Sequence, residues 1–144
     1  MFVEQISVFV ENKKGRLAQL ARSLGDAGID LITLSIADTT EFGILRCIIQ
    51  DVPKAMEVIR KAGFTAHVSK VIAVKVPDQP GGLADVLEPL AQADVGVEYL
   101  YSFVRKPKEN ALVIFKVDDV EAAESALCQS GIGIASLEEL CSFD

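Results

Sequence analysis

The chain has 144 residues, half of them hydrophobic, and 21 acidic against 14 basic residues give it a formal net charge of −7. This length can bury a core, and the acidic excess opposes binding to nucleic acid or anionic membranes. No apolar run reaches the roughly 20 residues of a membrane-spanning helix, and the first ten residues are strand-like rather than a leader. We therefore expect a cytoplasmic protein with neither nucleic acid nor membrane as a partner.

The first half of the chain predicts six elements in the order βαββαβ. Apolar residues alternate along the first segment, as in a half-buried strand, and then return every three or four positions, as in an amphipathic helix. Asp51 is placed to cap a second helix that Gly63 ends. The predicted strands are residues 2–10, 31–37, 44–50 and 65–69, the helices are residues 16–27 and the segment between Asp51 and Gly63, and residues 38–43 form a hairpin connection.

The second half repeats the first. Gly-Arg-Leu-Ala at residues 15–18 returns as Gly-Gly-Leu-Ala at residues 81–84, an offset of 81 − 15 = 66. From Leu45 and Val113 onward the offset is 113 − 45 = 68, which places a two-residue insertion near Pro107. The repeat predicts strands 70–76, 97–104, 111–117 and 133–137 and helices 82–93 and 120–130, the first of them kinked at Pro89.

Right-handed crossovers would place both helices of each half on one face of an antiparallel sheet. The predicted fold class is α+β, with two ferredoxin-like βαββαβ sandwiches in tandem. A period near seventy residues suits a small complete domain rather than a solenoid repeat. We expect two domains, residues 1–69 and 70–144, that stabilise each other.

In each half, a polar loop containing glycine opens the first helix. The first-turn N–H groups near residues 16–18 and 82–84 have no partner within the helix, so they can hold a small carboxylate. Asn12 and Asp78 place acceptor oxygens beside these donors, and the two groups together suit the two ends of a free amino acid. The alternative is that Asn12 and Asp78 only cap their helices or close the turn. Phosphate binding is disfavoured, because neither loop has the G-x-x-x-x-G-K-[ST] spacing.

These features resemble tandem ACT domains over nearly the whole chain. Residues 78–83 match the family's D-x-P-G-x-L signature in full, whereas the first copy has Lys14 where proline is usual. The resemblance implies a regulatory protein that is not an enzyme, carries no cofactor, binds an amino acid and controls a metabolic enzyme. It also implies ligand contacts from the loops and from the residue before the second strand, where Gly96 stands in place of Asp30. The predicted ligand-binding residues are Asn12, Lys14, Gly15, Arg16, Leu17 and Asp30 in the first copy and Asp78, Pro80, Gly81, Gly82, Leu83 and Tyr99 in the second.

In the resembled family, paired domains often join through their second strands. Residues 33–38 would then lie against residues 99–104, forming an eight-stranded antiparallel sheet with helices on one face and effector sites at the seam. Tyr99 belongs to an aromatic stripe that either packs on another sheet or chain, or walls a ligand pocket. Lys13, Lys14 and Arg16 form either a solvated loop face or an attractive surface for an anion.

Other chemistry is sparse. His67 is the only histidine and reads as a strand residue, and Cys47, Cys128 and Cys141 read as reduced thiols, with Cys47 in the core. We therefore predict no metal site and no catalytic set. Two functions remain open: a sensor that binds an amino acid between the two halves, and a ligand-free interaction module that forms a homodimer through its sheets and binds a partner enzyme.

Overall fold

The computed structural model describes residues 1–38, 41–104 and 110–142, which form two compact units. The N-terminal unit is Glu4–Ser69, and the C-terminal unit is Lys70–Asp144 together with Met1–Val3. The predicted turn at residues 39–40 and the insertion near Pro107 lie outside the described residues. None of the helices in the described part of the chain has the length and apolar character that crossing a bilayer requires.

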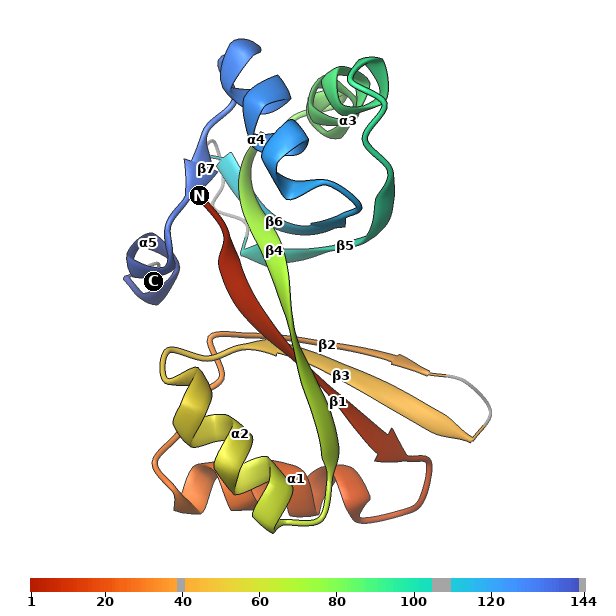
Figure 1. The fold of residues 1–144 in the computed structure, drawn as a ribbon, viewed down its shortest axis with the longest axis vertical. Helices are drawn as coiled ribbons and strands as arrows, with labels where there is room; N and C mark the ends of the chain where they lie inside the picture. Colours follow the sequence, from red (N-terminus) through yellow and green to blue (C-terminus); the bar gives the residue numbers. More distant parts are fainter. Residues whose placement is uncertain (39–40, 105–109, 143–144) are drawn as a thin grey trace. The chain divides into compact units, whose positions relative to one another are not determined.

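The N-terminal unit has the predicted order of elements. The strand order across its sheet is β2-β3-β1-β4. Strand β3 pairs antiparallel with β2 on one side and with β1 on the other. Both helices lie on one face of this sheet (Figure 1). The elements are β1 (Val3–Glu11), α1 (Arg16–Asp26), β2 (Thr33–Asp38), β3 (Phe42–Ile48), α2 (Val52–Lys61) and the first part of β4 (Thr65–Pro77).

The C-terminal unit repeats the arrangement and adds one short helix. Here β4 pairs with both β6 and β7, and β6 pairs with β5. Helices α3 and α4 again share one face (Figure 1). The elements after β4 are α3 (Gly82–Gln92), β5 (Val97–Val104), β6 (Asn110–Val117), α4 (Val120–Gln129), β7 (Ile134–Ala135) and α5 (Leu137–Cys141).

The structure corrects the predicted strands in two places. Segments 65–69 and 70–76 are one continuous strand, β4, so the described residues give a seven-stranded sheet and the eight-stranded sheet is not confirmed. Within its own unit, β2 is an edge strand that pairs with β3, and β5 is an edge strand that pairs with β6. Segment 133–137 is strand only at β7, because Ser136 begins α5. Helix α3 continues through Pro89 as a single element, and the kink stays a prediction.

Each unit has its own core, built from the repeated pattern. In the N-terminal unit, Ile6, Val8 and Val10 of β1 pack on Leu20 and Leu24 of α1. The corresponding residues of the C-terminal unit, on β4 and α3, are also buried together: Ile72, Val74, Val76, Val86 and Leu90. Burying a side chain of this kind contributes roughly 1.5–3 kcal/mol, so these few positions specify most of each sandwich.

The isolated thiol and imidazole behave as the sequence predicts. Cys47 is fully buried, and burial raises the pKa of its thiol to about 12, so it stays protonated in the core. His67 lies on β4 with its ring centroid 5.9 Å from that of Phe9 on β1. The described residues contain no cluster of three or more metal-ligating side chains.

Helix α5 is anchored at its start. The Ser136 hydroxyl accepts from Glu139 N at 3.2 Å and Glu139 Oε1 accepts from Ser136 N at 3.4 Å, which is a capping box. Glu139 Oε2 also lies 2.8 Å from Lys75 Nζ on β4. The Lys75 hydrogen bond, then the Ser136 backbone bond, holds the pKa of Glu139 below its usual value.

Glu139→Gln removes this ion pair and keeps an acceptor for the capping box. Because the pKa of Glu139 is lower in the folded state, the pair stabilises the protein above the ordinary carboxyl pKa and its contribution is lost as the pH falls through the folded pKa. The pair is half exposed, so in urea unfolding we expect a loss of up to about 1 kcal/mol at pH 7 and a smaller loss at pH 3. Glu138→Gln, which removes the same charge from the same helix, is the control. A Glu139→Gln loss that is as large at pH 3 as at pH 7 would contradict the assignment to the ion pair.

Candidate functional site

The loop between β4 and α3 is a tight turn built from backbone contacts. Gln79 N donates to Pro77 O at 2.9 Å and Gly82 N donates to Gln79 O at 3.0 Å. Gly81 is the N-cap of α3 and has a φ of +85°, in the left-handed region that favours glycine. A Cβ added at Gly82 would lie 2.0 Å from the Pro77 carbonyl oxygen, so only glycine fits there.

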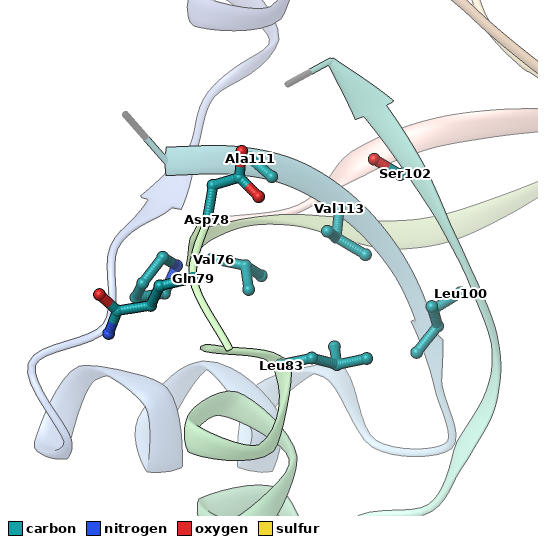
Figure 2. A pocket seen from close by; sticks show the side chains of 9 residues that line it. Val76, Asp78, Gln79, Leu83, Leu100, Ser102, Ala111 and Val113 are labelled. Carbon is teal, nitrogen blue, oxygen red and sulfur yellow. The ribbon is translucent and has the colours of Figure 1, made fainter. Parts of the chain in front are cut away.

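A cavity of about 290 Å³ lies beside this loop, entirely within the C-terminal unit. Its walls come from the end of β4, the loop, the first turn of α3 and strands β5 and β6 (Figure 2). Small-molecule pockets start at roughly 300 Å³, so this one suits a metabolite of few atoms. The lining residues are Val76, Pro77, Asp78, Gln79, Leu83, Leu100, Ser102, Ala111 and Val113.

The lining is aliphatic in its centre and polar at its edge. Figure 2 shows Val76, Val113 and Leu83 around the hollow, with the Asp78 carboxylate near Ala111 and the Ser102 hydroxyl on β5. The positive end of the α3 dipole is at Gly82, next to the Leu83 wall. The cavity therefore places a carboxylate, a hydroxyl and a helix N-terminus around an apolar hollow.

The N-terminal unit builds the corresponding loop differently. Its N-cap, Gly15, has a φ of +88°, but α1 begins at Arg16 rather than at glycine. The Arg16 guanidinium lies 4.2 Å from the centre of the Phe64 ring, donates to Gln19 Oε1 at 2.8 Å and lies 3.8 Å from Glu11 Oε1. These contacts hold Arg16 against its own unit.

Two cations of this first loop, Lys13 and Arg16, are paired with Glu11. Lys13 Nζ lies 3.1 Å from Glu11 Oε2, and the Lys13 hydrogen bond lowers the pKa of Glu11, with a smaller effect from Arg16. Glu11 thus offsets the charge of Lys13 and Arg16, which weakens the idea that this loop attracts an anion. Lys14 is exposed.

The structure places the predicted site residues in several groups. Asp78 and Leu83 line the cavity, whereas Pro80, Gly81 and Gly82 shape the loop without lining it. The residues from Asn12 to Leu17 gather at the loop of the N-terminal unit. The N-caps are Gly15 and Gly81, so Asn12 and Asp78 do not cap the helices, whereas a role of these two residues in closing the turn stays a prediction.

Two predicted residues lie away from these loops within their own unit. Asp30 precedes β2, whose start pairs with the end of β3, while Asn12 follows β1, whose end pairs with the start of β3. Asp30 and Asn12 are therefore at opposite ends of the sheet. Tyr99 is not a lining residue: Leu100 and Ser102 line the cavity, and side chains alternate along a strand, so Tyr99 faces the other side of β5.

Gly96, the counterpart of Asp30, lies against the Asp118 carboxylate. Asp118 Oδ1 accepts from Gly96 N at 3.0 Å, and a Cβ on Gly96 would lie 2.7 Å from Asp118 Oδ2. A carboxylate therefore does stand at the start of β5, but it comes from the residue after β6.

Sequence reasoning missed the lining residues that lie on strands: Val76, Leu100, Ser102, Ala111 and Val113. They lie on strands whose alternation was visible, yet only the pairing of β5 with β6 and of β6 with β4 brings them to one face. The signal that could have found these lining residues is strand alternation: every second residue along a strand faces the same side as the buried Val76 or its paired neighbour.

Comparison with known proteins identifies the kind of module. The model of the family described as the ACT domain pair matches residues 1–142, so the chain belongs to this family of regulatory modules. The fold is similar to that of protein BT0572 from Bacteroides thetaiotaomicron, with a TM-score of 0.91 and 31% identity over 99% of this chain and 98% of that chain.

More distant structures share the fold. The ligand-free regulatory subunit of aspartate kinase from Thermus thermophilus has a TM-score of 0.62 and 16% identity, covering 88% of this chain and 91% of that one. The regulatory subunit from Thermus flavus has a TM-score of 0.61 and 17% identity, covering 89% and 92%. No curated protein sequence matches the chain significantly.

Gly82→Ala tests whether backbone contact positions the loop. The added methyl would overlap the Pro77 carbonyl, so we expect a loss of about 1–3 kcal/mol of unfolding free energy. Gly25→Ala in α1 is the matched control: no heavy atom lies within 4 Å of its Cβ position, and a helical Gly-to-Ala change there should stabilise by up to about 1 kcal/mol. Equal effects of the two changes in urea unfolding would show that the close approach at Gly82 is unimportant.

Proposed function

We propose that this protein is a non-catalytic regulatory module that binds a free amino acid at the loop between β4 and α3. The observation that carries the proposal is the cavity of about 290 Å³ that adjoins both Asp78 and the N-terminus of α3. The Gly82 N–H already donates to Gln79 O, so the first-turn N–H groups of Leu83 and Ala84 would hold the ligand's carboxylate, and Asp78 would accept from its ammonium group. Both ends of an amino acid thereby find partners of opposite charge.

The output of such a module is a change in how it meets a partner. The fold is shared with regulatory subunits of aspartate kinase, and this supports a metabolic enzyme as the partner here. A ligand can shift such an association only through different affinities for the free and associated forms.

The edge strands favour self-association through the sheets. Leu34 and Ile36 on β2 are 61% and 50% exposed, and Leu100 on β5 is 38% exposed. Exposed apolar edge strands invite pairing with another chain. We propose a homodimer in which β2 of one copy pairs with β5 of the other, which would complete the eight-stranded arrangement between two chains and cover the cavity mouth.

A thermal-unfolding panel with the free amino acids tests the ligand. A ligand at about 100 times its Kd adds roughly 2.7 kcal/mol, and at roughly 2–4 °C per kcal/mol this moves the midpoint by several degrees. We expect a rise for one class of side chain, abolished in Asp78→Ala and retained in Asn12→Ala, the counterpart change in the N-terminal unit. A rise that survives Asp78→Ala would place the site elsewhere, and a flat panel would favour the ligand-free interaction module.

Leu34→Lys tests the dimer. A lysine on β2 would bring a charge into the proposed seam, so sedimentation velocity should show the dimer dissociating into monomers, with unchanged circular dichroism. Thr65→Lys, an exposed position at the start of β4, adds the same charge and should leave the dimer intact. A wild-type protein that sediments as a monomer at every concentration tested would exclude the proposed pairing.

A further inference from the structure

The two units differ at the position that faces the cavity from the edge strand. Ile36 pairs with Leu45 across β2 and β3, and Ser102 pairs with Val113 across β5 and β6. Since Leu45 and Val113 are repeat counterparts, Ser102 occupies the place of Ile36. The same correspondence makes Ala111, a wall of the cavity, the counterpart of Gly43.

In the N-terminal unit, the Ile36 side chain lies next to Gly43, the counterpart of Ala111. A Cβ placed on Gly43 would be 3.3 Å from Ile36 Cδ1 and 3.5 Å from Ile36 Cγ1. Ile36 therefore occupies space next to Gly43 that, in the C-terminal unit, is bordered by Ser102 and Ala111 and left open. The N-terminal unit therefore has the large Ile36 side chain beside Gly43. The C-terminal unit has the smaller Ser102 and Ala111 side chains at the edge of the cavity.

The loops enlarge this difference. In the C-terminal unit, Gly82 lets the start of α3 approach the Pro77 carbonyl. In the N-terminal unit, Arg16 stands at the same repeat position, and its guanidinium is held by Phe64, Gln19 and Glu11. The helix N-terminus and the hollow beside it are thus available together in the C-terminal unit.

The walls also select the side chain of a ligand. Val76, Leu83, Leu100 and Val113 present only aliphatic groups, and the polar lining atoms come from the loop and from Ser102. A second charge on the ligand, buried among aliphatic groups without a partner, would cost several kcal/mol. The position taken by Ile36 in the other unit shows that a branched aliphatic group can pack against this part of the sheet.

We propose that each chain binds one amino acid with a small aliphatic side chain, in the C-terminal unit, and that Ser102 is the residue that keeps this site open. This inference rests on the proposed function and adds the ligand class, the stoichiometry and the determining residue. Ile36 would do in the N-terminal unit what a bound aliphatic side chain does in the C-terminal unit, so a ligand there would meet the Ile36 side chain at the corresponding place.

The test uses titration calorimetry of the full chain with alanine, valine, leucine and isoleucine, and with aspartate, lysine and phenylalanine for comparison. Wild-type protein should bind the aliphatic ligands at one per chain. Ser102→Ile should weaken binding about tenfold or more, because a change of one methylene in a hydrophobic pocket changes affinity by roughly 10–200-fold. Ser102→Ala, which keeps the space and removes the hydroxyl, should retain affinity within a few-fold.

Two further variants serve as controls for the Ser102→Ile result. Ser102→Val carries less bulk than isoleucine and should give an intermediate loss if Ser102→Ile proves unstable. Ile36→Ser, the reciprocal change, lies on the proposed dimer seam and should weaken binding in the C-terminal unit less than Ser102→Ile does. Thermal unfolding without ligand checks that each variant is folded.

The outcomes separate this inference from the proposed function. Preferred binding of aspartate, lysine or phenylalanine would overturn the ligand class and leave amino-acid sensing intact. Two ligands per wild-type chain, or loss of binding in Ile36→Ser but not in Ser102→Ile, would overturn the single site in the C-terminal unit. If no amino acid binds to folded wild-type protein, the proposed function itself fails.

Discussion

Helix α3 can begin where it does because residue 82 has no side chain. Its backbone comes so close to the Pro77 carbonyl that any Cβ would overlap the oxygen. This approach fixes the first turn of α3 against the end of β4, and the first turn in turn carries Leu83 to the wall of the cavity. One backbone contact thus links the helix, the end of the strand and the cavity wall, which explains why glycine stands at residue 82 in this copy.

The duplicated chain shows which positions a sandwich needs and which it leaves free. The inward-facing triplets of β1 and β4 are apolar and buried in both units, because they fill a close-packed core. At the end of the first helix, Gly28 has a φ of +71° and its counterpart Asp94 a φ of +58°, a conformation that aspartate tolerates better than most residues. The two copies instead differ at the loop and on the edge strand. Arg16 of the first copy corresponds to Gly82 of the second, and Ile36 corresponds to Ser102.

The sequence predicted whatever is local or periodic. The helices follow from apolar spacing, the cap at Asp51 from its side-chain oxygen, and the two loops from the repeated glycine. Asp119 caps α4 in the same way, although this cap was not predicted from the sequence. Helix α5 could have been predicted from Ser136 and Glu139, a capping-box spacing, but the apolar residues before it read as a strand. The continuity of β4 was hidden because the repeat itself suggests a boundary between Ser69 and Lys70.

The cavity was predictable only in part, because its walls are far apart in the sequence. Asp78 and Leu83 belong to the loop motif, whereas Leu100, Ser102 and Ala111 arrive through strand pairing. Tyr99 was predicted as a site residue because it is aromatic. Side chains alternate along β5, however, so the next residue, Leu100, lines the cavity instead. A site of this kind is found by combining motif, strand register and side-chain size, since none of the three identifies it alone.

The same side chains would serve a ligand and a second chain. Leu83 and Leu100 line the cavity and remain about two-fifths exposed, so an amino acid in the hollow and a chain on the edge of β5 would both cover them. Two events that bury a shared surface are thermodynamically linked, and the linkage is reciprocal. If the ligand fills the hollow beneath the seam, the paired chains gain packing that the empty form lacks, and each event strengthens the other. An apolar edge strand beside a small cavity is therefore sufficient, with no moving domain, to make self-association depend on ligand concentration.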